Sequence, residues 1–299
     1  MDVVYFGSGE FGLPTLARLA RDHRVLAIVT QPDRPAGRGG VSTPTPIGAW
    51  AAESGIGPIL KPEKVNEPGV VAELRAIGAA AWVVIAFGQK LGKALLDGQF
   101  AINLHASLLP RWRGAAPINA AVIAGDAQVG NSVITLADRM DAGLILGQTR
   151  RPLDPGATAG EVHDLLAQDG PQLVSECLER QARRWTMQVV AQQESLVTLA
   201  PKLSRADSWV DFQQPATVCR RRVHGLSPWP GVTVRVEDIA LKLAHADVVR
   251  GITAAPGTLA DVETGVVACG GGTGIRLLDV QPAGGKPMQW AAFRRGGGR

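Results

Sequence analysis

Two polar side chains at the end of a predicted strand carry the clearest chemical signal in this sequence. Asn103 and His105 are separated by one residue, so on a strand they point to the same side. An amide can donate a hydrogen bond to an oxygen that gains negative charge, and an imidazole can move a proton. The pair therefore indicates a possible catalytic site, although a single histidine is more often structural.

A carboxylate follows in a turn between two apolar runs, residues 133–136 and 144–147. The turn reads Met140-Asp141-Ala-Gly143, and Asp141 is preferred over the nearby Asp138 because Ala-Gly follows it directly. The alternative is an aspartate that only shapes the turn. Between the histidine and this turn lies the rigid stretch SLLPRWRGAAP at residues 107–117, which carries two prolines and two cations.

Alternating strand and helix patterns must position these residues. Helices are expected at residues 11–22 and 67–77, and repeated strand–helix units predict a parallel sheet with helices on both faces. The carboxyl ends of such strands form the reactive edge of an open α/β sheet, where Asn103 and His105 would lie. The predicted strands are residues 2–6, 25–29, 82–86, 101–104, 133–136 and 144–147.

The second part of the chain has a different texture. Thr158 and Glu161 predict a capping box that begins a helix, which runs to about residue 185 with a possible break at Gly170-Pro171. Short apolar runs split by Pro and Gly then predict a small β-barrel or sandwich. The expected organisation is an α/β Rossmann-like domain at 1–189, a linker at 190–207 and a small β-domain at 208–299. The predicted runs of the β-domain are residues 231–236, 239–243, 257–262, 266–268 and 275–280.

A glycine motif near the N-terminus imitates a dinucleotide fingerprint. Gly7-Ser-Gly9-Glu-Phe-Gly12 is G-x-G-x-x-G after a strand and before a helix. The second strand ends at Gln31 without the acidic residue that the fingerprint requires, and Asp33 lies beyond it. Tight packing of the first helix on the sheet is the preferred interpretation.

Composition and charge narrow the class of protein. The chain has 299 residues, 45% of them hydrophobic and 19% charged, as in a globular protein. No basic secretory leader and no apolar run of membrane-spanning length are recognised, so a cytoplasmic protein is expected. The three cysteines are widely separated, with no C-x-x-C motif and no histidine at metal spacing, which argues against a disulfide framework or a structural zinc site. Residues 201–299 hold 13 Lys and Arg against 8 Asp and Glu, which favours an anionic partner or only solubilising charge.

Five stretches of the sequence carry a resemblance: TQPDRPAGRG (30–39), INLHASLLPRWRGAAPI (102–118), MDAG (140–143), APKLS (200–204) and DVQPAGGKPM (279–288). Together they resemble methionyl-tRNA formyltransferases along nearly the whole chain. The block around Asn103 and His105 with its SLLP is typical of folate-dependent formyltransferases as a class, whereas the loop at 30–39 and the RWRGAAPI extension are specific to the tRNA enzymes. Two departures are RMDAG at 139–143, where the family often has GLDTG, and Gly92, where it often has Pro.

The resemblance implies formyl transfer from 10-formyltetrahydrofolate to initiator methionyl-tRNA, with an OB-like C-terminal barrel that helps to hold the tRNA and with no metal. It implies a catalytic trio of Asn103, His105 and Asp141. Folate contacts are expected at Ser107, Leu108, Leu109, Pro110, Phe87, Gly88 and Leu91. For tRNA we expect contacts at Arg34, Arg38, Arg220, Arg221 and Arg222, because Arg stacks on bases and binds phosphate.

Two other functions stay open at this point. One is a folate formyl enzyme that acts on a glycinamide nucleotide or an amino sugar, which would not need the Arg38 loop or a basic C-terminal part. The other is an RNA-binding protein with an inactive Rossmann-like domain, against which the joint presence of Asn103, His105 and Asp141 argues. A monomer is expected.

Overall fold

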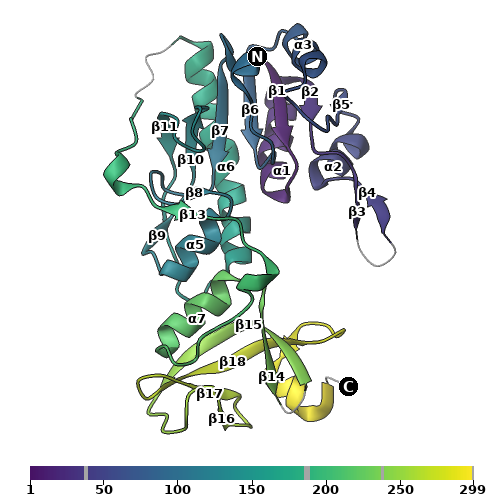
Figure 1. The fold of residues 1–299 in the computed structure, drawn as a ribbon. Helices are drawn as coiled ribbons and strands as arrows, with labels where there is room; N and C mark the ends of the chain where they lie inside the picture. The colour runs from purple at the N-terminus through teal and green to yellow at the C-terminus, as the bar shows by residue number, and fades with distance from the viewer. Residues whose placement is uncertain (37–39, 185–188, 237–238, 298–299) are drawn as a thin grey trace. The chain divides into compact units, whose positions relative to one another are not determined.

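A computed structural model describes residues 1–36, 40–184, 189–236 and 239–297 (Figure 1). The chain forms two compact units, and neither is continuous in sequence. The domain boundaries predicted at residues 189 and 208 assume domains that are continuous in sequence, whereas the two compact units combine separate segments. These boundaries therefore stay a prediction. The first unit contains residues 1–113, 130–150 and 163–198, and the second contains 114–129, 151–162 and 199–299.

A seven-stranded sheet forms the centre of the first unit, in the order β11-β10-β7-β6-β1-β2-β5. The five neighbouring strands β7, β6, β1, β2 and β5 are parallel, which confirms the predicted Rossmann-like sheet. Strand β10 instead runs antiparallel to both of its neighbours, β7 and β11, and a turn joins it to β11. The strands are β1 (Asp2–Gly7), β2 (Arg24–Val29), β5 (Ile59–Leu60), β6 (Ala81–Ile85), β7 (Ala101–His105), β10 (Ser132–Thr135) and β11 (Ile145–Gln148).

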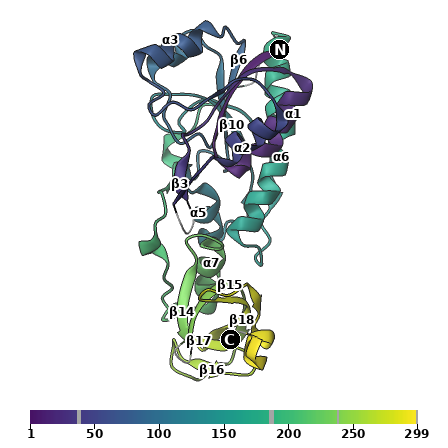
Figure 2. The same cartoon turned by 90° about the vertical axis from the view of Figure 1, so that its right-hand side faces the viewer.

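Helices cover both faces of this sheet, as the sequence predicted (Figure 2). On one face, Phe6 of β1 shares a core cluster with Leu74 of α3 and Leu95 of α4. On the other face, α6 packs so closely that a Cβ on Gly170 would lie 2.6 Å from the side chain of Leu104. The helices of this unit are α1 (Leu13–Asp22), α2 (Pro46–Ser54), α3 (Pro68–Ala76), α4 (Lys93–Leu96) and most of α6 (Ala159–Ala182); short elements are β3 (Arg34–Ala36), β4 (Val41–Thr43) and the 3-10 turns Glu10–Gly12 and Glu194–Leu196.

The glycine motif acts in packing. A Cβ on Gly7 would lie 2.7 Å from the hydroxyl of the buried Tyr5, and one on Gly12 would overlap the same ring. At Gly9 the nearest atom is 3.7 Å away, an ordinary contact. Tight packing at the start of α1 is thus confirmed at Gly12, whereas Gly7 makes room for the Tyr5 side chain at the end of β1.

Helix α6 begins at the predicted capping box. The Glu161 amide donates to Thr158 Oγ1 at 3.3 Å, and the Glu161 carboxylate accepts from the Thr158 amide at 2.8 Å. The helix then continues through Pro171 without the break considered from the sequence. Close packing of the preceding glycine on the sheet accounts for this continuity, because tertiary contacts offset the helix-breaking tendency of proline.

The second unit is built on an antiparallel sheet of order β14-β15-β18-β17-β16, with β19 paired to β18. This curled half-barrel confirms the predicted OB-like β-domain, and α7 packs on its core through Cys219 and Val223. Strands β15 and β18 are longer than the runs predicted from the sequence. The elements are α5 (Pro117–Ala124), β9 (Gln128–Val129), β12 (Arg151–Pro152), α7 (Ala216–Gly225), β14 (Val232–Val236), β15 (Ile239–Arg250), β16 (Leu259–Asp261), β17 (Val266–Cys269), β18 (Thr273–Pro282), β19 (Met288–Gln289), α8 (Trp290–Ala292), a 3-10 turn (Arg205–Asp207) and a π-turn (Phe293–Gly297); β8 (Arg113–Gly114) and β13 (Leu199–Ala200) complete the chain.

Among the residues that the structure describes, no helix is long and apolar enough to cross a membrane.

Candidate active site

His105 ends β7 with its ring almost fully buried, at 6% exposure. Its Nε2 lies 2.9 Å from the carbonyl oxygen of Trp112. A carbonyl can only accept, so Nε2 donates, and Nδ1 is left to take or give up a proton. Nδ1 lies 3.7 Å from Asp141 Oδ2, longer than a hydrogen bond but close enough for an ion pair with a protonated ring.

Asp141 lies in the turn between β10 and β11 with a φ of +53°, the left-handed region that non-glycine residues rarely adopt. Two residues later, Gly143 has no room for a side chain, because a Cβ would lie 2.6 Å from the Thr135 carbonyl carbon. The Leu144 amide donates to Thr135 Oγ1 at 2.9 Å and fastens the end of the turn to β10. The turn thus holds the Asp141 carboxylate opposite His105.

Asn103 lies two positions before His105 on the same side of β7, with a half-buried side chain. Its backbone neighbours are Val84 in β6 and Ile134 in β10. The structure therefore brings His105 and Asp141 together and places Asn103 on the same strand face, as the spacing predicted.

The predicted folate segment at residues 107–110 is anchored by two side chains that the sequence interpretation missed. Ser132 Oγ donates to the Ser107 carbonyl at 2.6 Å and accepts from the Leu109 amide at 3.1 Å. Gln148 Nε2 donates to the Leu109 carbonyl at 2.9 Å. Both residues lie on strands, where a serine or glutamine gives no sequence signal for such a role. Leu108 and Pro110 are half-buried within this anchored segment.

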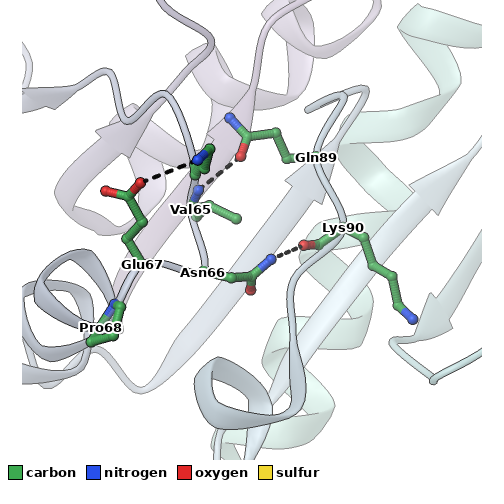
Figure 3. A pocket seen from close by; sticks show the side chains of 7 residues that line it. Val65, Asn66, Glu67, Pro68, Gln89 and Lys90 are labelled. Atoms are coloured by element: carbon green, nitrogen blue, oxygen red, sulfur yellow. Dashed lines mark hydrogen bonds and ion pairs between the residues drawn. The ribbon is translucent and has the colours of Figure 1, made fainter.

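The other predicted folate residues differ in accessibility. The side chains of Phe87 and Leu91 are buried and belong to a core cluster of the sheet. Gly88 is exposed, with a φ of +86°. Close by, a hollow of about 450 Å³ is lined by Lys64, Val65, Asn66, Glu67, Pro68, Gln89 and Lys90 (Figure 3).

Hydrogen bonds fix the walls of this hollow. Asn66 donates to the Lys90 carbonyl at 2.8 Å, and Gln89 Oε1 accepts from the Val65 amide at 2.8 Å (Figure 3). The segment after β5 is thereby tied to the segment after β6, at the carboxyl ends of the parallel strands.

Of the two arginines predicted in the loop after β2, Arg34 begins a hairpin of β3 and β4. Its guanidinium pairs with Glu63 at 2.6 Å, and both side chains are exposed. Arg38 lies outside the described residues.

The three arginines predicted to contact phosphate lie on α7 and are half-buried. Arg222 stacks on the ring of Trp209 at 4.0 Å and donates to the Trp209 carbonyl at 2.6 Å, and burial lowers its pKa. Arg221 lies against Gly125, and its guanidinium is 3.5 Å from the Ala124 carbonyl. Arg222 thus has a packing role that its sequence context did not indicate.

Comparison with known proteins gives the family. A family model described as "Formyl transferase" matches residues 1–178, and one described as "Formyl transferase, C-terminal domain" matches residues 202–298. Methionyl-tRNA formyltransferase of Nitrobacter hamburgensis is 39% identical over 98% of this chain and 96% of its own length. That of a Methylobacterium species is 40% identical over 99% of this chain and 96% of its own length.

Solved structures agree on the fold. An N-formyltransferase from Helicobacter canadensis has a TM-score of 0.68 at 11% identity and covers 92% of this chain and 98% of its own. HypX from Aquifex aeolicus has a TM-score of 0.66 at 15% identity over 99% of this chain, which spans about half the length of HypX, 48%. The family models and the relatives of similar length lead to one conclusion: the chain belongs to the methionyl-tRNA formyltransferase family.

Proposed function

We propose that this chain transfers the formyl group of 10-formyltetrahydrofolate to the amino group of initiator methionyl-tRNA, giving N-formylmethionyl-tRNA for translation initiation. The relatives named as methionyl-tRNA formyltransferases match it from end to end. The observation that carries the proposal within the structure is the His105–Asp141 pair, at 3.7 Å, on the strand face that also carries Asn103.

In the proposed reaction these side chains stabilise a negative charge and transfer a proton. The amine attacks the formyl carbon, and the formyl oxygen gains negative charge in a tetrahedral intermediate. The Asn103 amide donates a hydrogen bond to that oxygen, and removal of such a donor costs about 3 kcal/mol in oxyanion holes. His105 exchanges a proton through Nδ1, the nitrogen that does not donate to Trp112, and Asp141 orients the ring and balances its charge. The bond between the formyl carbon and N10 of the folate then breaks, and N10 takes up the proton that His105 received from the attacking amine. No step is assigned to a metal.

A folate-derived donor fits the family. HypX has been solved in complex with tetrahydrofolic acid, and the Helicobacter canadensis enzyme with folinic acid. For this chain we propose that the folate lies against residues 107–110 and the exposed backbone at Gly88, because Phe87 and Leu91 face the core.

The tRNA is assigned to the basic second unit and to the loop that carries Arg34 and Arg38. Arg220 and Arg221 are the better candidates for phosphate contacts on α7, since Arg222 is engaged with Trp209. A location in the cytoplasm is part of the proposal, because a charged tRNA is the acceptor, and the chain is taken to act as a monomer.

Transfer of label tests the proposal directly. The purified chain is incubated with 10-formyltetrahydrofolate labelled in the formyl carbon, together with initiator tRNA charged with methionine. Label should appear on the methionyl-tRNA and not on the same tRNA without its amino acid. A nucleotide-linked amino sugar serves as the competing acceptor. Label on the sugar alone, or on neither acceptor, would refute the assignment.

A further inference from the structure

The Asp141 turn is held in its left-handed conformation by a side chain from a distant part of the chain. Nε2 of Gln192 donates to the Asp141 carbonyl at 2.7 Å and to the Gly143 carbonyl at 2.8 Å. The amide nitrogen of Gln192 therefore donates both of its hydrogens, one to each of the carbonyls on either side of Ala142. This contact holds the backbone that carries the Asp141 carboxylate.

The other end of Gln192 is fixed by a buried cation. Oε1 of Gln192 accepts from Nε of Arg113 at 2.8 Å. Guanidinium groups only donate and carbonyls only accept, so the neighbours determine which end of the amide is oxygen and which is nitrogen. Arg113 is 6% exposed, and its guanidinium pairs with Glu194 at 3.0 Å. Glu194 also pairs with Arg139, at the start of the turn, at 2.9 Å.

The same stretch of backbone serves both members of the proposed catalytic pair. The carbonyl of Trp112 accepts from His105, and the next residue, Arg113, orients Gln192 and through it Asp141. The amides of Trp112 and Arg113 are both anchored at Thr198, on its Oγ1 and its carbonyl, each at 2.9 Å. The dipeptide thus fixes the position of His105 and Asp141 relative to each other.

We propose that Gln192 is a positioning residue of the formyl-transfer site, acting by holding the Asp141 turn against His105; the inference rests on the proposed function. Gln192 contacts the backbone of the turn and no reacting atom. Its loss acts on turnover through the placement of the Asp141 carboxylate.

The test compares Gln192→Glu with the parent and with Gln193→Ala. A glutamate keeps the size and still accepts from Arg113, but its carboxylate cannot donate to the two carbonyls of the turn. Gln193 is the exposed neighbour with no side-chain hydrogen bond to the turn that follows it, so it serves as the matched control. Gln192→Met, of similar length without either hydrogen-bonding end, replaces the glutamate variant if that variant does not fold by circular dichroism.

Displacement of a catalytic group by about 1 Å can cost roughly 100-fold in rate. We therefore expect Gln192→Glu to lower kcat by about that factor, with KM for both substrates within a few-fold and Gln193→Ala unchanged. In an Asp141→Asn background the same change should lower kcat less than about threefold, because residues that act as a unit are not additive.

Equal fold-losses from Gln192→Glu in the two backgrounds would overturn the positioning role, as would a kcat within threefold of the parent. The activity of the parent enzyme distinguishes failure of this positioning role from failure of the proposed function. An active parent with an unaffected variant removes only the role of Gln192, whereas an inactive parent removes the proposed function and the role together.

Discussion

Replacing Gly143 by alanine tests how closely the Asp141 turn must pack against β10. A Cβ at this position would lie 2.6 Å from the Thr135 carbonyl carbon and closer still to its oxygen. Ordinary contacts begin at about 3.4 Å, so the two segments must separate by roughly 1 Å or more. Thr135 is fixed in β10 by its pairing with Ile102 of β7, and the turn is therefore the part that moves.

The size of the effect follows from what that movement breaks. Thr135 and Leu144 exchange two hydrogen bonds, of 3.0 and 2.9 Å, and each is worth about 1 kcal/mol. The free energy of unfolding of Gly143→Ala should fall by about 2 kcal/mol. Because Asp141 would shift by about 1 Å relative to His105, kcat should fall roughly 100-fold.

The assay combines urea unfolding with steady-state formyl transfer at saturating folate and methionyl-tRNA. Gly9→Ala is the matched control, since its Cβ would meet only an ordinary contact at 3.7 Å. A Gly143→Ala enzyme with the stability and kcat of the Gly9→Ala enzyme would refute the claim that the turn is packed without room for a side chain.

Four further substitutions test other parts of the molecule. His105→Ala should lower kcat at least about 100-fold in steady-state assays while folate binding, measured by calorimetry, is kept; a loss of only a few-fold would remove His105 from the mechanism. Burial lowers the pKa of His224 to about 4, so between about pH 4 and 6.5 the folded chain binds fewer protons than the unfolded chain and stability rises with pH. Urea unfolding of the parent should show a loss of about 2 kcal/mol from pH 7 to pH 5 that His224→Gln lacks, and parallel curves would contradict this linkage. When the KM for tRNA is measured over a series of salt concentrations, Arg220→Ala should reduce the log–log slope by about 0.7 to 0.9, and an unchanged slope would exclude a phosphate contact. Arg38→Ala should lower kcat as well as the affinity for tRNA, and an unchanged kcat/KM would exclude its role.

Local patterns in the sequence predicted six of the seven strands of the central sheet and the helices α1, α3 and α6, but not α2, α4 or β5. The continuous apolar run at 82–86 indicated a buried strand, and the residues of β6 are all buried. Alternation along β7 placed Asn103 and His105 on one side, and the turn that carries Asp141 lies beside His105. These predictions succeeded because strand periodicity and turn chemistry act over a few residues.

Strand direction and the use of individual cations could not be predicted in this way. An apolar run does not say whether its partner is parallel, and β10 and β11 proved antiparallel to their neighbours. Arg222 belongs to a run of three arginines, a residue type that binds phosphate, yet its guanidinium stacks on Trp209, which lies 13 residues earlier in the chain. Whether an arginine is available to a partner depends on what the fold packs against it.

The support of Asp141 illustrates the same limit inside the candidate site. Gln192 falls in a polar stretch that the sequence presented as a linker, and it reaches back 51 residues to the carbonyl of Asp141. No sequence pattern marks a glutamine in such a stretch as a positioning residue. Its role depends on two carbonyls and one guanidinium that only the fold brings within 3 Å of its side chain. The groups proposed to do chemistry are fixed by local spacing, whereas their relative placement depends on contacts between distant segments. Variants that alter such contacts, and leave Asn103, His105 and Asp141 in place, are therefore the sharpest test of how this site is assembled.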